Sequence, residues 1–430
     1  MEQSGRLFQV GNKERQKPFY FRSWGRFRVT YIADLIKEHC PNGVEWKELG
    51  EVCVVKTGQQ INKTFIQNNL GRYPVVNSGK EPLGFVNVYN TEDDPIGITS
   101  RGAGVGYVSW NEGKYFRGNL NYSSTIKDSN VILPKFLYYF LKNSFKAIEN
   151  LCTFEGIPAL NKSNLEMLKI PIPPLKIQEE IVQILDKFTE YVTELTAELT
   201  LRQKQYNYFR DYLLNFDSDS SGGANNKVYQ VEWKTLGEIL IKGRGTKVTA
   251  GQMKELHKDG APIRIFAGGK TFADVDYGDI PEKDVHHEEA IIVKSRGIID
   301  FEYYTKPFSF KNEFWSYSSD SDDVNLRYVY HYLNHNKSHF QHIAGNMQMP
   351  QISSNDTEKY KIPLPTKTVQ SRIVQVLDNF DTVCNDLNIG LPKEIELRQK
   401  QYEYFREKLL TFTAEGVYPG QWTVSGDRPT

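Results

Sequence analysis

Two short patterns that could bind an anionic ligand each occur twice in this sequence. Ser100-Arg101-Gly102 returns as Ser295-Arg296-Gly297, and Gly79-Lys80 returns as Gly269-Lys270. Lysine and arginine contact phosphate, arginine also reads guanine, and an adjacent glycine lets the backbone approach a ligand closely. One such pair would indicate only an ordinary surface charge. Because both patterns are repeated, they favour two equivalent surfaces that bind nucleic acid.

Further basic residues around these patterns alternate with Asn, Ser, Gln and Tyr, and asparagine and glutamine can read adenine. The candidate DNA-contacting residues are Lys56, Lys63, Lys80, Arg101, Lys114, Arg117, Lys242, Arg244, Lys247, Lys270 and Arg296. Residues 56–147 hold 11 Lys/Arg against 6 Asp/Glu, whereas residues 234–345 hold 15 against 16. The first region could therefore face phosphates on charge alone, and the second only with its charges segregated. The whole chain, with 53 residues of each sign, has no global field that would attract a polyanion.

Patterns that would indicate catalysis are incomplete. Residues 264–271 imitate a phosphate-binding P-loop but lack its leading glycine. Glu45-Trp46-Lys47 and Glu232-Trp233-Lys234 have the E-x-K spacing of metal-dependent nucleases. Because they are repeated, they are better explained as the strand that opens each half of the chain.

A metal site is also not supported. His331, His335 and His339 fall on one helical face and could hold zinc, yet no Cys or Glu at fitting spacing completes a site. The four cysteines are scattered without a C-x-x-C pair, which argues against zinc and against a disulfide framework. We therefore expect no metal, no cofactor and no catalytic residue in this chain. Reduced cysteines, and the lack of an apolar run of roughly 18–20 residues, predict a cytoplasmic protein.

The chain contains an internal duplication with a long period. Its repeated segments are residues 44–52 with 231–239, residues 169–173 with 361–365, and residues 201–210 with 397–406. Between them, residues 55–150 and 240–345 share far less similarity. A solenoid would show a period of about 20–50 residues. We interpret the chain as two modules on a shared frame, each free to bind something different.

Each module is predicted to mix short strands and helices. Apolar runs punctuated by Gly, Pro, Asn and Asp predict strands, which fall at 73–76, 95–98, 105–108, 263–266 and 290–293. Helical patterns follow at 135–141 and 326–333. The predicted fold class is α+β.

Apolar residues spaced alternately by four and three predict a long coiled-coil helix after the first module. The seam consists of Ile181, Leu185, Phe188, Val192, Leu195, Leu199, Tyr206 and Phe209, and in the second copy of Ile373, Leu377, Phe380, Leu387, Tyr402 and Phe405. The offset between copies grows from 192 (373 − 181) to 196 (402 − 206) near Gly390 and Pro392. Four extra residues are a stutter, and proline breaks or kinks a helix. We expect a continuous first helix over 178–216, about 58 Å long, and an interrupted second one.

The domain boundaries follow from these patterns. They are an extension outside the fold at 1–28, a first module at 29–170, a central helix at 171–216, a polar linker at 217–230, a second module at 231–362, a C-terminal helix region at 363–412 and a tail at 413–430. The first 28 residues show no clean period, so we expect the native chain to start at or near Val29.

Five kinds of segment in this chain form a specific combination: Val-Glu-Trp-Lys at 44–47, Gly-Ile-Pro-Ala-Leu-Asn at 156–161, Ile-Pro-Ile-Pro-Pro-Leu at 170–175, Gln-Glu-Glu-Ile-Val at 178–182 and the repeated Leu-Arg-Gln-Lys-Gln-Tyr. In these segments the chain resembles the specificity (S) subunit of a Type I restriction–modification system, over about residues 29–412. Thr-Ala-Glu-Leu at 196–199 is similar to the four-residue units of this family's central helix. The second copy departs from the pattern at 345–350, and Thr366 stands where Pro174 does.

The resemblance implies two target recognition domains, at 29–170 and 231–362, each reading one half of a split DNA sequence. It implies that the long helices pair as an antiparallel coiled coil, with an internal pseudo-two-fold repeat, and that their seam region binds partner subunits. The implied partners are double-stranded DNA, two modification (M) methyltransferase subunits that carry S-adenosylmethionine, and restriction (R) subunits. The chain itself would be non-catalytic.

Two other interpretations stay open on the sequence. The chain could be the recognition part of a single-chain restriction–modification enzyme, which methylation by the purified chain alone would indicate. It could instead be a scaffold whose modules bind protein, which salt-sensitive binding to duplex DNA would exclude.

Overall fold

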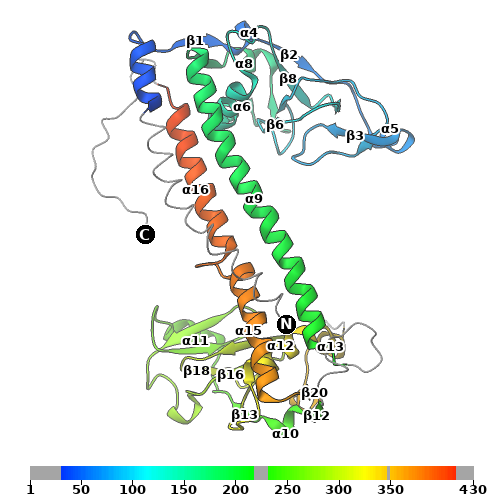
Figure 1. The fold of residues 1–430 in the computed structure, drawn as a ribbon, viewed down its shortest axis with the longest axis vertical. Helices are drawn as coiled ribbons and strands as arrows, with labels where there is room; N and C mark the ends of the chain where they lie inside the picture. The colour runs from blue at the N-terminus through cyan, green and yellow to red at the C-terminus, as the bar shows by residue number, and fades with distance from the viewer. Residues whose placement is uncertain (1–30, 217–230, 346–348, 413–430) are drawn as a thin grey trace, which may run out of the picture. The chain divides into compact units, whose positions relative to one another are not determined.

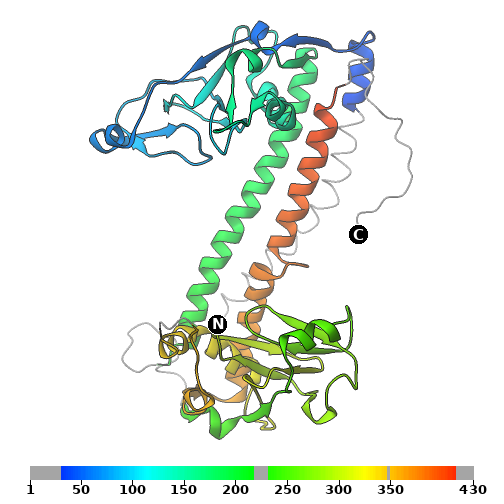
Figure 2. The same cartoon turned by 180° about the vertical axis from the view of Figure 1, so that it is seen from behind.

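The computed structural model describes residues 31–216, 231–345 and 349–412. The expected N-terminal extension, the linker and the tail lie outside the described residues. The chain divides into two units, Met1–Glu194 with Ile395–Thr430 and Leu195–Glu394. Each unit contains one module and part of the long helices (Figures 1 and 2).

Two sheets form the module of unit 1. The four-stranded sheet has the order β2-β8-β5-β6, from Cys53–Thr57, Asn121–Ile126, Ile96–Thr99 and Val108–Trp110. The three-stranded sheet has the order β4-β3-β7, from Phe85–Val86, Leu70–Val76 and Phe116–Arg117. Neighbouring strands are antiparallel except β3 and β7, which are parallel. The strands predicted at 73–76 and 95–98 are confirmed, whereas 105–107 belong to the turn before β6.

The module of unit 2 repeats this topology. Its four-stranded sheet has the order β13-β19-β16-β17, from Ile241–Arg244, Trp315–Ser318, Ala290–Lys294 and Asp300–Tyr304. Its three-stranded sheet has the order β15-β14-β18, from Phe272–Val275, Ile263–Phe266 and Phe308–Phe310, and β14 and β18 are again the parallel pair. The two dissimilar interiors therefore share one fold. Apolar patterning and side-chain volume, more than residue identity, specify such a core.

Helices complete the core of each module. In unit 1 they are α5 (Lys63–Asn68), α6 (Pro134–Asn143) and α7 (Phe145–Asn150); in unit 2 they are α11 (Ala250–Leu256), η1 (Glu282–Asp284), α12 (Leu326–His335) and α13 (Lys337–Ile343). The helices predicted at 135–141 and 326–333 are thus confirmed as α6 and α12. On α6, Phe136 and Leu137 are buried in one cluster with Val55 and Ile98 of the four-stranded sheet. On α12, Val329 is buried in the corresponding hydrophobic cluster of unit 2.

The repeated segments at the two ends of each module pair with each other. In unit 1, β1 (Glu45–Glu48) lies antiparallel to β11 (Lys169–Ile172), with Trp46 opposite Pro171. In unit 2, β12 (Glu232–Thr235) pairs with β20 (Lys361–Leu364) in the same register. Lys47 forms an ion pair with Glu45 of its own strand, N···O 3.4 Å. The interpretation of the two E-x-K segments as opening strands is therefore confirmed.

Short elements surround these pairs. They are a helix at 31–39, α4 (Leu49–Val52), β9 (Cys152–Thr153), β10 (Ala159–Leu160) and α8 (Lys162–Glu166) in unit 1, and α10 (Leu236–Ile239) and α14 (Ser354–Glu358) in unit 2. The α4 and α10 helices both begin with a capping box, in which the N-cap and N3 side chains satisfy each other's main-chain N–H groups. The repeated sequence thus produces repeated local structure.

The long helices follow the prediction. The first, α9 (Leu175–Leu214), is continuous for 40 residues. The second is divided into α15 (Lys367–Asn385) and α16 (Leu391–Leu410), and Pro392 stands in the first turn of α16, where a missing N–H costs nothing. Figures 1 and 2 both show α9 beside α16, with β3 and α5 at the end of the unit 1 module away from α9. Among the described residues, no helix is long and apolar enough to cross a lipid bilayer.

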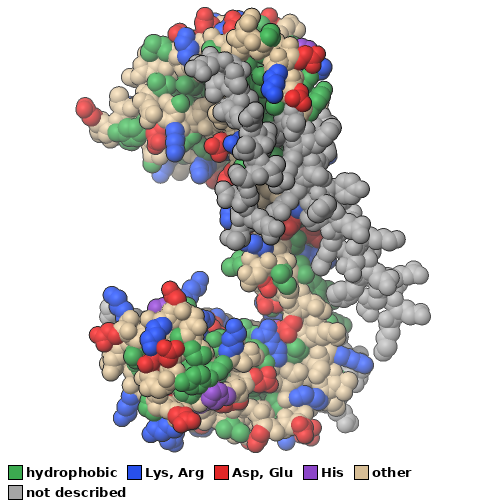
Figure 3. All heavy atoms as spheres, turned by 90° about the vertical axis from the view of Figure 1, so that its left-hand side faces the viewer, with side chains coloured by type: hydrophobic (Ala, Val, Ile, Leu, Met, Phe, Trp, Pro, Cys, Tyr) green, Lys and Arg blue, Asp and Glu red, His purple; other side chains and the backbone are tan. Residues whose placement is uncertain are grey.

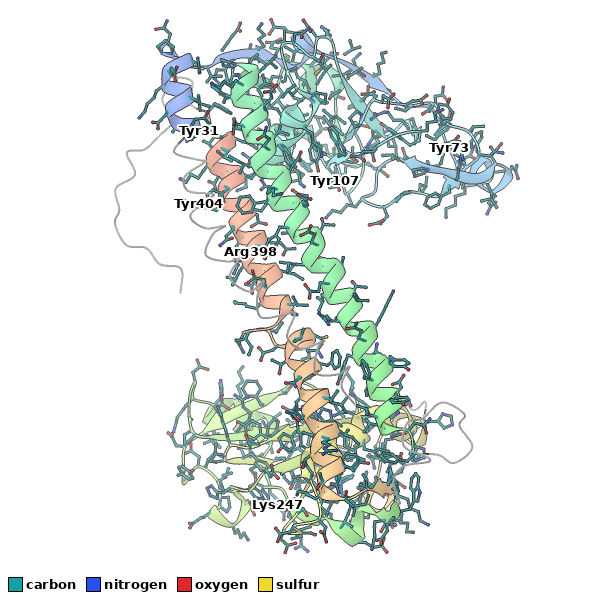
Figure 4. All side chains as sticks on the ribbon, in the orientation of Figure 1. Tyr31, Tyr73, Tyr107, Lys247, Arg398 and Tyr404 are labelled. Carbon is teal, nitrogen blue, oxygen red and sulfur yellow. The ribbon has the colours of Figure 1, made fainter. Side chains whose placement is uncertain are left out.

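Within each unit, α9 packs in antiparallel orientation against the second long helix, which is α16 in unit 1 and α15 in unit 2. In unit 1, Phe188 stacks on Phe405 with ring centroids 5.1 Å apart, and the Arg398 guanidinium lies 5.4 Å from the Tyr191 ring. Figure 4 labels Arg398 on α16. In unit 2, the ring of Phe380 on α15 is 6.2 Å from Tyr206 and 5.6 Å from Phe209.

The predicted seam is buried or half-buried over its length, with two exposed exceptions. Ile181, Leu185 and Phe188 are fully buried. Leu387, however, lies in the break between α15 and α16 and is 71% exposed, so its assignment to the seam is wrong. Phe209 is also partly exposed although it contacts Phe380.

The histidines of the second module have separate partners. His331 is buried with Nε2 2.7 Å from Asp378 Oδ1, and His335 Nδ1 lies 3.5 Å from Asp211 Oδ1. The ring of His339 packs on Tyr360. Within the described ranges, no group of three metal-binding side chains comes together.

Candidate nucleic-acid interface

The Ser-Arg-Gly turn of unit 1 is fixed to the segment that leaves the module. The Gly102 N–H donates to Pro158 O at 2.9 Å, and the Leu160 N–H donates to Ser100 O at 2.8 Å. Arg101 therefore stands directly opposite Ala159 in a β-bridge, with its side chain exposed. Gly102 adopts a φ of 98°, a conformation that favours glycine.

Unit 2 builds the same turn with the same main-chain bonds. The Gly297 N–H donates to Pro350 O at 2.8 Å, and the Ile352 N–H donates to Ser295 O at 3.0 Å. Arg296 stands opposite Gln351, and Gly297 again has a positive φ, 75°. Two modules with dissimilar interiors thus present an arginine from the same backbone position.

The Gly-Lys loops lie against these turns. In unit 1, Lys80 Nζ is 5.8 Å from the ring centroid of Tyr107, which follows the arginine turn (Figure 4). A Cβ at Gly104 of that turn would lie 2.9 Å from Ser78 O, so the close approach requires glycine. In unit 2, the buried Lys294, next to Ser295, donates to Gly269 O at 2.8 Å.

Each module therefore brings its two repeated basic motifs to one place. We name this place the basic corner. In unit 1 it comprises residues 78–80, 100–107 and 158–160, and in unit 2 residues 268–270, 294–297 and 350–352. The structure places Lys80 with Arg101, and Lys270 with Arg296, on adjoining exposed loops.

Most of the other candidate cations lie outside the basic corners. Lys56 and Lys63 are exposed on β2 and α5, and Arg244 and Lys247 are exposed at and after the end of β13. Lys114 pairs with Glu92 at 3.3 Å, and Lys242 forms an ion pair with Glu358. The face of unit 2 visible in Figure 3 mixes basic and acidic side chains, as expected from its near-neutral charge. The positive charge of each paired lysine is therefore partly neutralised, which weakens its attraction for an anionic ligand.

Arg117 is not available to DNA, which corrects the sequence prediction. It is only 3% exposed and lies on β7 inside the module. Its Nη1 donates to Asn121 Oδ1 at 2.7 Å and to the carbonyl of Ile96 at 3.1 Å, and its Nη2 lies 3.4 Å from Asp94 Oδ2. Burial lowers the pKa of Arg117, while Tyr115 and Asp94 act in the opposite direction. The side chain ties strands of the module together.

The matching position of unit 2 explains why this role was not visible in the sequence. Val76 pairs with Arg117 in unit 1, and Phe266 pairs with Phe310 in unit 2. Phe310 is fully buried. One module thus fills this buried position with a hydrogen-bonded cation and the other with a phenyl ring. In the sequence, Arg117 is one basic residue in a basic region, so nothing distinguished a buried structural arginine from an exposed DNA-contacting one.

Comparison with known proteins identifies the family. The Type I restriction modification DNA specificity domain matches residues 41–202 and 230–397. The chain belongs to this family. It is 33% identical over 406 residues to the EcoR124I/EcoR124II specificity subunit of Escherichia coli, covering 86% of this chain and 94% of that protein. It is 30% identical over 408 residues to a putative type I restriction enzyme specificity subunit of Haemophilus influenzae, covering 89% and 99%.

Solved structures share the fold. The S subunit of the Type I restriction–modification system from M. genitalium aligns with a TM-score of 0.62 at 20% identity, over 86% of this chain and 96% of that one. A chain from a structural study of complex assembly in the type I R-M system aligns with a TM-score of 0.50 at 16% identity, over 86% and 97%. The α+β class and the two target recognition domains of a specificity subunit are thus established.

The target recognition domain of unit 1 is joined to α9 by a glutamine that the sequence analysis did not single out. Gln178 is fully buried. Its Oε1 accepts from the Leu133 N–H at 2.8 Å, and its Nε2 donates to Val131 O at 2.9 Å and to Pro173 O at 2.7 Å. The amide therefore binds the loop before α6 to the start of α9.

Gln370 repeats this arrangement in unit 2. It accepts from the Asn325 N–H at 2.8 Å and donates to Asp323 O at 2.9 Å and Pro365 O at 2.7 Å. The signals in the sequence were the place of Gln178 in the Gln-Glu-Glu-Ile-Val segment and a polar residue repeated at an offset of 192 (370 − 178) beside an apolar seam. Two of its three partners are loop main-chain groups 45 and 47 residues away, and no residue pattern reveals these contacts.

A carboxylate eight residues further along each helix (186 − 178 and 378 − 370) makes a second link. Asp186 on α9 accepts a hydrogen bond from the Tyr139 hydroxyl on α6. Asp378 on α15 accepts from Arg327 Nε at 2.9 Å and contacts His331 on α12. Burial lowers the pKa of His331, although its hydrogen bond to Asp378 acts in the opposite direction. Both domains are thus held to their helices by the same two devices.

Proposed function

We propose that this chain is the DNA-recognition subunit of a Type I restriction–modification complex, and that each target recognition domain reads one half of a bipartite target. The observation that supports this most directly is the repeated basic corner. Lys80 with Arg101, and Lys270 with Arg296, stand at equivalent places in two domains of the same topology. The surrounding side chains differ, as two half-sites of different sequence would require.

The long helices offer a repeated surface for partner subunits. In almost identical segments, α9 exposes Leu201 and Tyr208, at 55% and 64%, and α16 exposes Leu397 and Tyr404, at 37% and 45%. Exposed leucine and tyrosine at matching positions suit a protein interface. We propose that these two surfaces bind two copies of the modification methyltransferase, so that one chain imitates a symmetric dimer. Restriction subunits would join the same complex.

The chemistry is assigned to those partners. S-adenosylmethionine would be bound by the modification subunit, and this chain would position the complex on DNA without catalysing a step. Methylation of duplex DNA by the purified chain alone would overturn this assignment and favour the single-chain enzyme.

The decisive experiment compares the two domains in the assembled complex. The chain is co-expressed with its modification subunit, and the methylated sequence is read from the host genome. Lys80→Ala and Arg101→Ala should weaken or relax one half-site, and Lys270→Ala and Arg296→Ala the other, because each domain contacts only its own half. Leu201→Ala with Tyr208→Ala should reduce capture of the modification subunit while leaving the fold intact.

Two results would count against the proposal. If substitutions in one domain changed both half-sites equally, the two domains would not be independent readers. If the wild-type complex bound duplex DNA without salt dependence, phosphate contacts by these cations would be excluded.

A further inference from the structure

The two basic corners differ at one residue that touches the arginine. Gln351 faces Arg296 across the β-bridge, and the Arg296 Nε donates to Gln351 Oε1 at 3.0 Å. In unit 1 the residue facing Arg101 is Ala159, whose side chain has no group that could accept a hydrogen bond. The two main-chain bonds that flank the arginine are the same in both corners.

The backbone beneath Arg296 is fixed. Ser295 is buried, and its Oγ donates to Glu313 O at 2.7 Å. The Gly297 N–H bond to Pro350 and the Ile352 N–H bond to Ser295 hold the arginine between them. The Nε–Oε1 bond then restricts the plane of the guanidinium, because Nε lies in that plane.

This arrangement suits base reading. With Nε bound, the terminal nitrogens Nη1 and Nη2 are left to bind a ligand, and neither bonds to another of the described residues. Two parallel N–H groups match O6 and N7 of guanine in the major groove. A side chain already held in one orientation loses less conformational freedom when it binds. An arginine opposite alanine keeps its freedom and suits a phosphate, which can be approached from many directions.

We propose that Arg296, oriented by Gln351, reads a guanine in the half-site of the second target recognition domain, and that Arg101 contacts phosphate. Gln351 is then a positioning residue. This inference rests on the proposed function, because it requires that the basic corners face DNA.

The test uses the complex of the full chain with its modification subunit. Duplexes carrying every base pair at each position of the second half-site are bound at several salt concentrations. Arg296→Ala should lower the preference for guanine at one position by about 5- to 150-fold. Gln351→Ala should lower the same preference less, and the double variant should be no worse than Arg296→Ala alone. Gln351→Glu keeps an acceptor for Nε and should retain the preference.

Arg101→Ala is the matched control. It should weaken binding of the first half-site to the same extent whatever its base sequence, leave the base preferences of the second half-site unchanged, and reduce the slope of log K against log salt by about one. Ala159→Gln, which gives Arg101 a partner, should add a base preference to the first half-site without reducing affinity. Melting curves of each variant show whether it folds as the wild type does.

The outcomes separate this inference from the proposed function. A wild-type complex without any sequence preference would overturn both. A wild-type complex that reads its target, but whose preference survives Gln351→Ala unchanged, would overturn the inference alone. A uniform loss of affinity in Arg296→Ala, with a reduced salt slope, would show that Arg296 contacts phosphate and would also overturn it.

Discussion

At the scale of single residues, Gln178 satisfies three main-chain groups that would otherwise be buried without partners. Gln178→Leu keeps similar volume but leaves these groups unpaired, at about 1–3 kcal/mol for each group that water does not reach. We expect a lower free energy of unfolding, measured by denaturant titration. Gln203→Leu, at an exposed position of α9, is the matched control and should change little. Equal stability of the two variants would contradict a structural role for the Gln178 amide.

His331 should make the stability of the second domain depend on pH. Its folded-state pKa lies below the ordinary 6.5 because burial disfavours the charged ring. The unfolded chain therefore takes up the proton at higher pH, so stability is full above about pH 6.5 and falls as the pH drops below it. His331→Tyr places there the residue that Tyr139 provides in unit 1, and should remove this part of the dependence. Calorimetric melting of both proteins between about pH 7.5 and pH 5 measures the difference.

Charged groups near His331 also act on the pKa of its ring. Asp378 and Asp381 favour the protonated ring, whereas Arg327 disfavours it. If stability rose on acidification in the wild type and not in His331→Tyr, the carboxylates would outweigh burial, and the assigned direction of the pKa shift would be wrong.

At the scale of elements, we expect substitutions in the helix seam to impair folding and assembly more than exchanges of the module interior sequence do. Leu185 and Leu195 on α9 are both buried. Changing both to Glu buries charges that cost several kcal/mol each unless paired. We expect loss of folding or of binding to the modification subunit, measured by melting and by co-purification. Asn207→Glu is the matched control, because the second copy carries Glu403 at that place.

The converse holds for the module interiors. Both interiors have one topology despite dissimilar sequences. Replacing residues 60–145 with the corresponding segment of another family member should therefore leave assembly intact and change one half-site. Normal assembly of the Leu185→Glu, Leu195→Glu variant, or failed assembly of the exchange, would contradict this division of roles.

At the scale of the whole molecule, α9 runs without interruption from the end of the first domain toward the second. Inserting one more Thr-Ala-Glu-Leu unit after Leu199 lengthens it by about 6 Å. If the helices set the distance between the domains, both half-sites should be retained with a longer spacer between them. Sequencing of methylated host DNA reads the spacer directly. A same-length change, Ala197→Ser, should leave it unaltered.

The break between α15 and α16 bears on that result. The inserted unit also shifts the seam as a four-residue stutter, and residues 386–390 could absorb part of the change. An active insertion variant with an unchanged spacer would mean that the helices do not act as the ruler.

Features that depend on neighbours along the chain were predictable from the amino-acid sequence. The seam spacing fixed α9 as continuous, and Pro392 with the shift in offset fixed the division of the second helix. The repeated segments indicated two modules, and the composition of the module interiors indicated short strands. Such features are local, because helical periodicity and proline act within a few residues.

The meeting of distant segments, in contrast, depends on the three-dimensional fold. The pairing of β1 with β11 joins residues more than 120 positions apart, and the basic corners collect loops from three parts of each module. The burial of Arg117 and the bonds of Gln178 depend on what surrounds them in space, so the sequence did not reveal them and led to a wrong prediction that Arg117 contacts DNA. A polar side chain reads the same in sequence whether it faces water or a buried carbonyl, and the fold alone separates the two.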